Sequence, residues 1–162
     1  MGTVWNRNLD IFRTVIEAVR DLDLALIVTV GRQNDPAALG PQPHNVFVHQ
    51  YIPQGVLLSR CDAVVTHGGA GTTLGALAFG VPLLALPQGA DQYANADRVV
   101  AAGAGRQLLK HQLSAAAVRD ALLGLLHDRS YRRAAERIKT EIRDMPDASE
   151  AISRIARLHS TA

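Results

Sequence analysis

The sequence predicts an α/β fold, a doubly wound parallel sheet with helices on both faces. Short apolar, β-branched segments such as Leu24–Val30 and Ala63–Thr66 are typical of buried parallel strands. They alternate with segments of helical periodicity such as Leu9–Leu22. Alternating strands and helices predict a parallel sheet covered on both faces. Because the chain has 162 residues, 48% of them hydrophobic, we expect residues 1–162 to form a single domain with its own core.

The order of the predicted elements follows from their boundaries. Ser114 and Asp91 are predicted N-caps, since their side-chain oxygens can accept a bond from the first amides of a helix. Gly80 ends one helix, and Pro82 prevents it from continuing. In chain order the sequence predicts a helix over 9–22, a strand over 24–30, a loop with a short helical turn near 37–39, a strand over 45–49, a short helix over 55–60, a strand over 63–66, a helix from 72 or 73 to 80, a strand ending near 87, a helix over 93–102, a strand over 105–109, and helices over 114–127, 129–143 and 149–158.

The composition argues against several kinds of partner. The 17 basic residues exceed the 15 acidic ones by only two, and no basic block occurs, so nucleic acid is not expected. The single cysteine, Cys61, rules out an internal disulfide and fits a buried thiol in a reducing compartment. No apolar segment approaches the ~20 residues that span a membrane, so we expect a cytoplasmic protein without a membrane partner. The six histidines lack zinc-ligand spacing, so no metal is expected.

Residues 62–87 form the most informative segment. A strand ends at His67, and Gly68, Gly69 and Gly71 allow a sharp turn and the close approach of a ligand. A helix begins immediately afterwards, and its free amides and positive dipole end favour anions, phosphate above all. The carboxyl edge of a parallel sheet is also where open α/β folds bind ligands. The segment therefore predicts a phosphate-bearing ligand.

A dinucleotide cofactor fits this segment poorly. Gly69 and Gly71 supply the first two glycines of the dinucleotide fingerprint, but the third falls at Gly75, one position late. The acidic residue expected ~20 residues further on corresponds by count to Asp91, which lies beyond Pro87 rather than at a strand tip. A nicotinamide or flavin cofactor is therefore disfavoured.

Four motifs agree in order and spacing with a known signature. They are Tyr51-Ile52-Pro53-Gln54, His67-Gly68-Gly69-Ala70-Gly71-Thr72, Gly80-Val81-Pro82, and Pro87 followed by Asp91-Gln92. With them the chain resembles the carboxyl-terminal, nucleotide-sugar-binding half of the GT-B glycosyltransferases. It is most similar to bacterial natural-product enzymes related to the UDP-glycosyltransferases of plants and animals. The resemblance covers nearly the whole chain and implies a Rossmann-like sheet that binds a nucleoside-diphosphate sugar.

The resemblance also implies a role for each residue of these motifs. Tyr51 would stack on the nucleobase, His67 would contact the diphosphate, and Asp91 with Gln92 would read hydroxyls of the sugar. Each has a structural alternative: His67 can simply end a strand, Tyr51 can be a half-buried aromatic, and Asp91 can be a helix cap. The implied donor-binding residues are Thr3, Tyr51, Ile52, Gln54, His67, Gly69, Ala70, Gly71, Thr72, Asp91 and Gln92.

One position departs from the family pattern. Plant-like members carry an acidic residue on the donor helix that binds the ribose hydroxyls, and Gly75 occupies its place here. A ribose 2′-hydroxyl would lose a charged hydrogen bond worth about 1–3 kcal/mol, whereas a deoxyribose would lose less. The sequence therefore favours a dTDP-sugar over a UDP-sugar.

The resemblance implies a metal-independent glycosyltransferase of which this chain supplies only the donor half, so the isolated chain is expected to be inactive. The catalytic base and acceptor pocket belong to an amino-terminal domain in the family. The chain also begins after the first, central strand of this half, so we expect a fragment or one piece of a split protein. A partner chain, or exchange between copies in a homo-oligomer, would fill the empty position. The alternatives are a nucleotide-sugar epimerase of the same architecture and a non-catalytic nucleotide-sugar-binding module.

Overall fold

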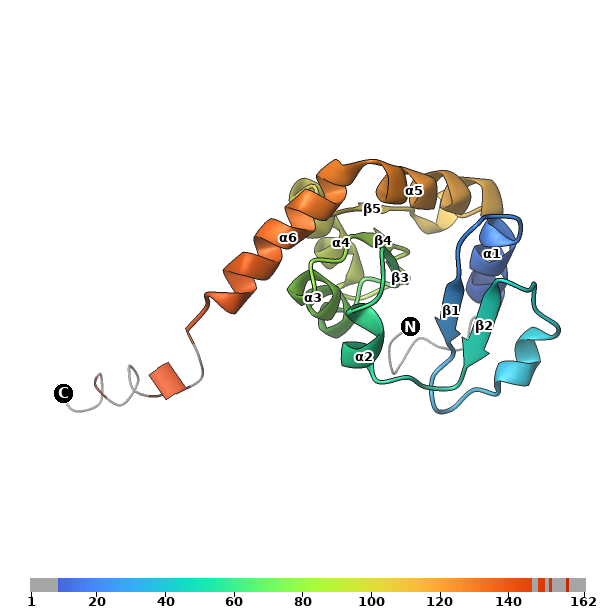
Figure 1. Cartoon of the computed structure of the whole chain (residues 1–162), viewed down its shortest axis with the longest axis horizontal. Coiled ribbons are helices and arrows are strands. Elements are labelled where there is room, and N and C mark those ends of the chain that lie inside the picture. The colour runs from blue at the N-terminus through green and yellow to red at the C-terminus, as the bar shows by residue number, and fades with distance from the viewer. Residues whose placement is uncertain (1–8, 147–148, 151, 153–156, 158–162) are drawn as a thin grey trace.

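The computed structural model describes residues 9–146, 149–150, 152 and 157 as an α/β arrangement of parallel strands flanked by helices (Figure 1). This confirms the predicted fold class. The helices are α1 (Leu9–Val19), α2 (Gln54–Leu58), α3 (Ala70–Ala78), α4 (Gln92–Ala101), α5 (Ala115–His127) and α6 (Arg129–Arg143). The strands are β1 (Leu26–Thr29), β2 (Val46–His49), β3 (Val64–Thr66), β4 (Leu83–Ala85) and β5 (Gly105–Gln107), and short 3-10 turns cover Pro36–Leu39 and Lys110–Gln112.

The described strands form two parallel sheets rather than one. The first sheet has the order β1-β2, with Leu26 opposite Val46, and the second has the order β3-β4-β5, with Val64 opposite Leu83. β1 and β3 are not paired with each other. Figure 1 places β1, rather than β2, on the side of the second sheet. Among the described residues, the strand order is interrupted between β1 and β3.

One apolar core nevertheless joins the two sheets. It contains Val28 and Val46 from the first sheet and Leu84 from the second, together with the apolar faces of α1 and α5, which pack against each other. A second core lies under α3 and α6 and includes Leu77 and Ala135. Because α1 and α5 contribute to this core, residues of both sheets pack within one apolar cluster across the interruption between β1 and β3.

The first sheet is less buried than the sequence predicts. Val46 is 5% exposed, but its neighbour Phe47 is 49% exposed and Ile27 of β1 is 42% exposed. Alternate residues of a strand face opposite sides, so the described helices cover only one face of this sheet. The prediction of a buried strand over 24–30 therefore holds for Val28 and Val30, which are 6% and 0% exposed, but is wrong for Ile27.

The helix boundaries show which caps form. Ser114 accepts a hydrogen bond from the Ala117 amide at 3.1 Å, so its predicted cap is confirmed. Asp91 stands at the N-cap position of α4, but its side chain makes no capping bond there. Helix α3 begins at Ala70 rather than Thr72, because Gly69 is already its extended N-cap. The predicted helix over 149–158 falls mostly outside the described residues.

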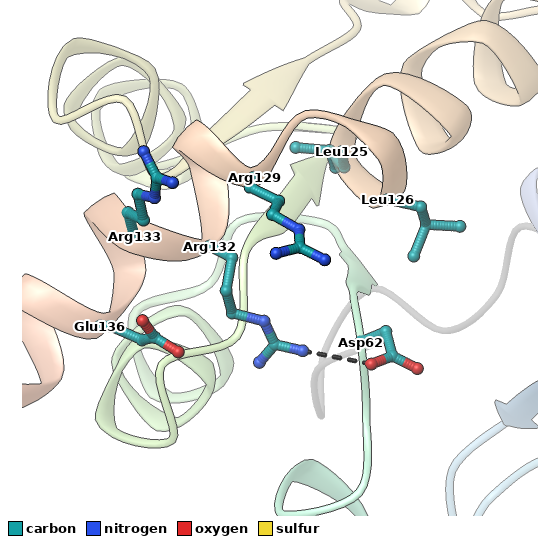
Figure 2. Close-up of a pocket in the computed structure, with 7 residues that line it drawn as sticks. All are labelled: Asp62, Leu125, Leu126, Arg129, Arg132, Arg133 and Glu136. Atoms are coloured by element: carbon teal, nitrogen blue, oxygen red, sulfur yellow. Dashed lines mark hydrogen bonds and ion pairs between the residues drawn. The ribbon is translucent and has the colours of Figure 1, made fainter.

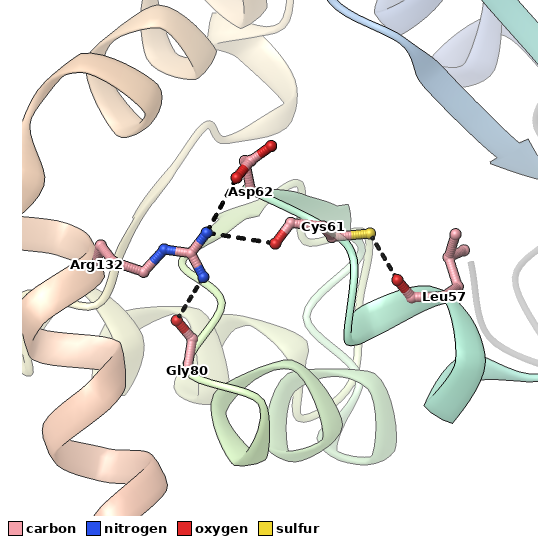
Figure 3. Close-up of polar contacts among 5 residues, drawn as sticks. All are labelled: Leu57, Cys61, Asp62, Gly80 and Arg132. Carbon is pink, nitrogen blue, oxygen red and sulfur yellow. Dashed lines mark hydrogen bonds and ion pairs between the residues drawn. The ribbon is translucent and has the colours of Figure 1, made fainter.

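Helix α6 is tied to the amino ends of β3 and β4 by one side chain. Figure 3 shows the Arg132 guanidinium donating to the carbonyl oxygens of Gly80, at 3.1 Å, and Cys61, at 3.4 Å. It also lies 3.2 Å from a carboxylate oxygen of Asp62. Gly80 has φ +72°, the left-handed backbone that ends α3 and favours glycine. This arrangement fixes α6 against the end of the sheet opposite to His67.

Candidate functional site

The start of α3 presents backbone amides that the helix itself does not use. The amide of Thr73 donates to the carbonyl of Gly69 at 3.0 Å, which is the first bond of the helical ladder. The amides of Ala70, Gly71 and Thr72 precede this bond, and the described residues supply no acceptor for them. Gly69 has no side chain to cap them. At the segment where the sequence predicts an anion site, the structure thus has helix N-terminal donors for which the described residues supply no acceptor.

His67 lies beside these donors, at the end of β3. Its side chain is 6% exposed, and burial lowers its pKa below the usual 6.5. A Cβ atom on Gly69 would stand only 2.5 Å from His67 Nε2, so the ring packs against the Gly69 backbone. Burial therefore favours the neutral imidazole, which can still donate one hydrogen bond.

A second loop reaches the same helix from the end of β2. The side-chain amide of Gln54 donates to the Thr72 hydroxyl at 3.0 Å, which joins the Tyr51–Gln54 motif to the start of α3. Tyr51 is 52% exposed, and the Arg32 guanidinium lies 4.2 Å from its ring centroid. One face of the Tyr51 ring therefore carries a cation–π contact. Ile52 is half-buried between these residues.

The loop after β4 brings the third motif to the site. Asn95 donates through its amide to the Gly68 carbonyl at 3.0 Å and to Asp91 Oδ2 at 2.8 Å. Gln92 is 3% exposed, and its Oε1 accepts from the backbone amides of Gln88 and Gly89 at 2.8 and 3.2 Å. These two donors orient the Gln92 amide so that its Nε2 is the group left for a ligand.

The structure thus brings three of the predicted motifs together at one edge of the sheet. Gln54 bonds to Thr72 and Asn95 joins Asp91 to the turn after His67. Thr3 lies outside the described residues.

The sequence reasoning missed three residues of this edge. Asn95 lies one helical turn after Asp91, and this position could have indicated that it contacts Asp91. Nothing in the sequence indicates that Arg32 lies at this edge. Thr73 is 6% exposed, and its hydroxyl has no hydrogen-bond partner among the described residues.

Family comparison agrees with this geometry. The model of the "Erythromycin biosynthesis protein CIII-like, C-terminal domain" family matches residues 13–158, which include all three of these motifs. The chain belongs to this family of glycosyltransferases.

Individual relatives of this glycosyltransferase chain match over most of its length. The oleandomycin glycosyltransferase of Streptomyces antibioticus is 34% identical over 88% of this chain and 33% of its own. The solved calicheamicin glycosyltransferase CalG4 superposes with a TM-score of 0.90 at 33% identity, over 100% of this chain and 43% of that chain. The glycosyltransferase VinC in complex with dTDP superposes with a TM-score of 0.82 at 30% identity, over 92% of this chain and 37% of that chain.

This glycosyltransferase-family chain spans only part of its relatives. It covers between 31% and 40% of the length of the curated relatives it matches. Among the described residues no helix is long and apolar enough to cross a membrane. Within the same residues no group of three or more metal-ligating side chains is found.

A pocket lined by arginines lies elsewhere (Figure 2). It has a volume of about 450 Å³, lies at the amino end of the sheet, and is lined by Arg129, Arg132, Arg133, Glu136 and Asp62 with two leucines. None of the predicted donor-binding residues lines it. Near it, burial raises the pKa of the half-buried Cys61 thiol, which donates to the Leu57 carbonyl at 3.2 Å.

Proposed function

We propose that this chain is the donor-binding half of an inverting glycosyltransferase. It would bind a nucleoside-diphosphate sugar whose sugar passes to a small hydrophobic natural-product acceptor. The observation that carries the proposal is the set of free amides of Ala70, Gly71 and Thr72 beside His67. Family membership and the oleandomycin and calicheamicin relatives support the same reaction class.

In the proposed complex the diphosphate rests on the start of α3. The free amides and the Thr72 hydroxyl would hold its oxygens, and His67 would donate a further hydrogen bond. The base would stack on the Tyr51 face that Arg32 leaves open, with its edge at the Ile52 backbone. The sugar would extend toward Asp91 and the Nε2 atom of Gln92.

The chemical contribution of this half is to stabilise the leaving group. In the proposed step an acceptor oxygen forms a bond to the anomeric carbon, the bond from that carbon to the diphosphate breaks, and the acceptor proton passes to a base. Charge develops on the departing diphosphate, and in the proposed complex the α3 amides would stabilise it. A helix terminus contributes only ~0.3–2 kcal/mol. The direct amide bonds, at about 1.5–3 kcal/mol each to a charged acceptor, would therefore dominate.

A dTDP-sugar is the proposed donor class. Gly75 follows Thr72 on α3 and offers no side-chain acceptor to a ribose 2′-hydroxyl. The relative VinC has been crystallised with dTDP at 30% identity to this chain. An epimerase would need acid and base groups around the sugar, and Asp91 is the one carboxylate of the proposed sugar pocket.

Isothermal titration calorimetry of the 162-residue chain with dTDP, UDP and NAD tests the proposal. We expect nucleoside diphosphates to bind, dTDP more tightly than UDP, and binding to fall at least tenfold in His67→Ala. Arg129→Ala, at the opposite end of the sheet, is the matched control and should bind dTDP normally. Preferential binding of NAD would overturn the proposal.

A further inference from the structure

Two loops at the carboxyl edge of the first sheet leave their strands side by side. The parallel ladder of β1 and β2 continues beyond the strands, where the Gly31 amide donates to the Gln50 carbonyl at 2.9 Å. The side-chain amide of Gln50 donates in return to the Arg32 carbonyl at 3.0 Å. The residue that precedes Tyr51 is therefore tied to the loop that carries Arg32.

The chain around Arg32 forms a closed turn. The Asn34 amide donates to the Gly31 carbonyl at 3.1 Å, and the Asn34 side chain donates to the Val30 carbonyl at 2.7 Å. Gly31 has φ +90°, the left-handed backbone that favours glycine. These bonds use neighbouring residues and the Arg32 carbonyl, so the course of the backbone does not depend on the Arg32 side chain.

The guanidinium of Arg32 contacts an aromatic ring rather than an acid. Its central carbon lies 4.2 Å from the centroid of the Tyr51 ring, well within the distance of a cation–π contact. Among the described residues no carboxylate forms an ion pair with it. A planar guanidinium can stack flat on an aromatic face, so this contact restrains the orientation of the ring.

Tyr51 has little else to fix its orientation. Its side chain is 52% exposed, so burial alone leaves the ring able to change rotamer. A side chain that becomes ordered only when a ligand binds lowers the affinity, because its conformational freedom is lost at that moment. A contact that orders the ring beforehand therefore raises the affinity for whatever stacks on it.

We infer that Arg32 is a positioning residue of the nucleobase subsite. Its guanidinium covers one face of the Tyr51 ring and keeps the ring in place, and the base stacks on the opposite face. Arg32 thus acts on the base of a pyrimidine nucleoside diphosphate rather than on its phosphates. This role rests on the proposed function, because Tyr51 is the base-stacking residue of the proposed complex.

The alternative role of a cation at this edge is to attract the diphosphate over a distance. The two roles differ in the part of the nucleotide that responds to a substitution. Long-range attraction acts on charge, so it would favour inorganic pyrophosphate at least as strongly as dTDP. A positioned ring favours dTDP alone, because pyrophosphate has no base.

Titrations of the 162-residue chain with dTDP and with inorganic pyrophosphate, followed by NMR at the amides of Gly71 and Thr72, test the role. Arg32→Ala should weaken dTDP binding by about three- to tenfold and change pyrophosphate binding by less than about 1.5-fold. Arg32→Lys keeps the cation without the planar group, so its dTDP affinity should fall between those of Arg32→Ala and the unchanged chain. Arg137→Ala removes an exposed arginine of α6 and is the matched control for net charge, which should leave both affinities unchanged.

A double-mutant cycle adds a second measurement. Tyr51→Leu removes the ring, so adding Arg32→Ala to it should weaken dTDP binding by no more than about 1.5-fold further. Three results would each overturn the inference: no loss of dTDP affinity in Arg32→Ala, an equal loss for pyrophosphate, or the same loss with and without the Tyr51 ring. Each of these leaves the proposed function standing while the unchanged chain binds dTDP. If the unchanged chain binds no nucleoside diphosphate, the proposed function fails and this inference fails with it.

Discussion

The two ends of the three-stranded sheet both gather groups that attract anions, but the donors at the amino end are arginine side chains and those at the carboxyl end are backbone amides. At the amino end, Arg132 is bonded to the Gly80 carbonyl and lies beside Asp62. At the carboxyl end, the amides from Ala70 to Thr72 precede the first bond of α3. The Arg132 guanidinium therefore already stabilises the fold, whereas the described residues supply no acceptor for the α3 amides.

This difference separates groups that stabilise the fold from groups that are available to a ligand. A guanidinium that is already bonded must break those bonds to hold a ligand, and a buried group that loses its partner costs about 1–3 kcal/mol. Free amides at a helix N-terminus exchange only water for the ligand. Arg132, which lines the 450 Å³ pocket, is already bonded within the fold, whereas the described residues supply no acceptor for the three amides at the start of α3.

The largest expected effect comes from Gly69→Ala. Its Cβ would lie 2.5 Å from His67 Nε2, so the ring must move. The variant would disturb both the imidazole and the neighbouring amides. Losing two charged hydrogen bonds at about 1.5 kcal/mol or more each predicts a loss of about 100-fold or more in dTDP affinity by calorimetry.

Gly71→Ala is the matched control for that variant. A Cβ on Gly71 meets nothing within 4 Å, so the fold and His67 stay in place. We expect its dTDP affinity to fall by less than about tenfold. If Gly69→Ala binds as well as Gly71→Ala, the diphosphate does not rest beside His67.

The second effect concerns stability at the amino end. Arg132→Met should lower the free energy of unfolding by about 2 kcal/mol, chiefly through the lost bond to Gly80. The pair with Asp62 contributes little, because that carboxylate is 83% exposed. Thermal denaturation should show a melting temperature lower by ~4–8 °C.

Arg129→Met, in the same pocket, is the control and should change stability by less than about 0.5 kcal/mol. Both variants should bind dTDP normally. If Arg132→Met keeps full stability but fails to bind dTDP, the nucleotide binds at the amino end of the sheet rather than at the carboxyl end.

The sequence predicted the alternation of elements because its signals are local. Apolar periodicity located α1, and the β-branched segment before His67 located β3. Burial was less predictable: Ile27 and Phe47 have strand-like apolar character but are 42% and 49% exposed. Their exposure depends on which elements lie across the sheet, and the residues of the strand itself carry no information about that.

The candidate site was predictable where it depends on backbone chemistry. Glycines after a strand predict free amides before a helix, and the structure has them at Ala70 to Thr72. Side-chain partnerships were not predictable. The sequence predicts Asp91 as a helix cap, but its carboxylate accepts a hydrogen bond from the Asn95 side chain instead. Arg32 contacts the Tyr51 ring from a loop 19 positions earlier in the chain. Such contacts require the tertiary arrangement.

The third prediction tests whether the carboxyl end of the sheet prefers dTDP to UDP. A Cβ on Gly75 would meet Leu58 Cδ1 at 3.5 Å and Gln54 Oε1 at 3.8 Å, which are ordinary contacts. Gly75→Glu should thus fold and supply the missing acceptor for a 2′-hydroxyl. We expect the UDP-to-dTDP affinity ratio to rise about tenfold, as for one charged hydrogen bond.

Gly75→Ala is the control that removes the glycine from α3 without adding a side-chain acceptor. Both substitutions should stabilise α3 by roughly 0.5–1 kcal/mol, because glycine is a poor helix former. Only Gly75→Glu should change the affinity ratio. An unchanged ratio in a stabilised Gly75→Glu protein would show that the ribose lies away from α3.

The smallest effect is the pH dependence that His67 gives to the carboxyl end. Burial lowers its pKa below 6.5, so between the folded and unfolded pKa values the unfolded chain binds more protons. This contribution to stability is complete above pH 6.5 and is lost as the pH falls toward the folded pKa. One proton limits the slope to about 1.4 kcal/mol per pH unit.

Bound diphosphate should raise the pKa of His67, because a nearby anion favours the imidazolium form. Between pH 7 and pH 5, the dTDP affinity of the unchanged chain should therefore rise relative to that of His67→Gln, by less than about tenfold per pH unit. The nucleotide itself titrates equally in both experiments, so its titration cancels in the ratio of the two affinities. Parallel profiles for the two proteins would mean that His67 does not approach the phosphates, and the contrast between the two ends would then rest on the α3 amides alone.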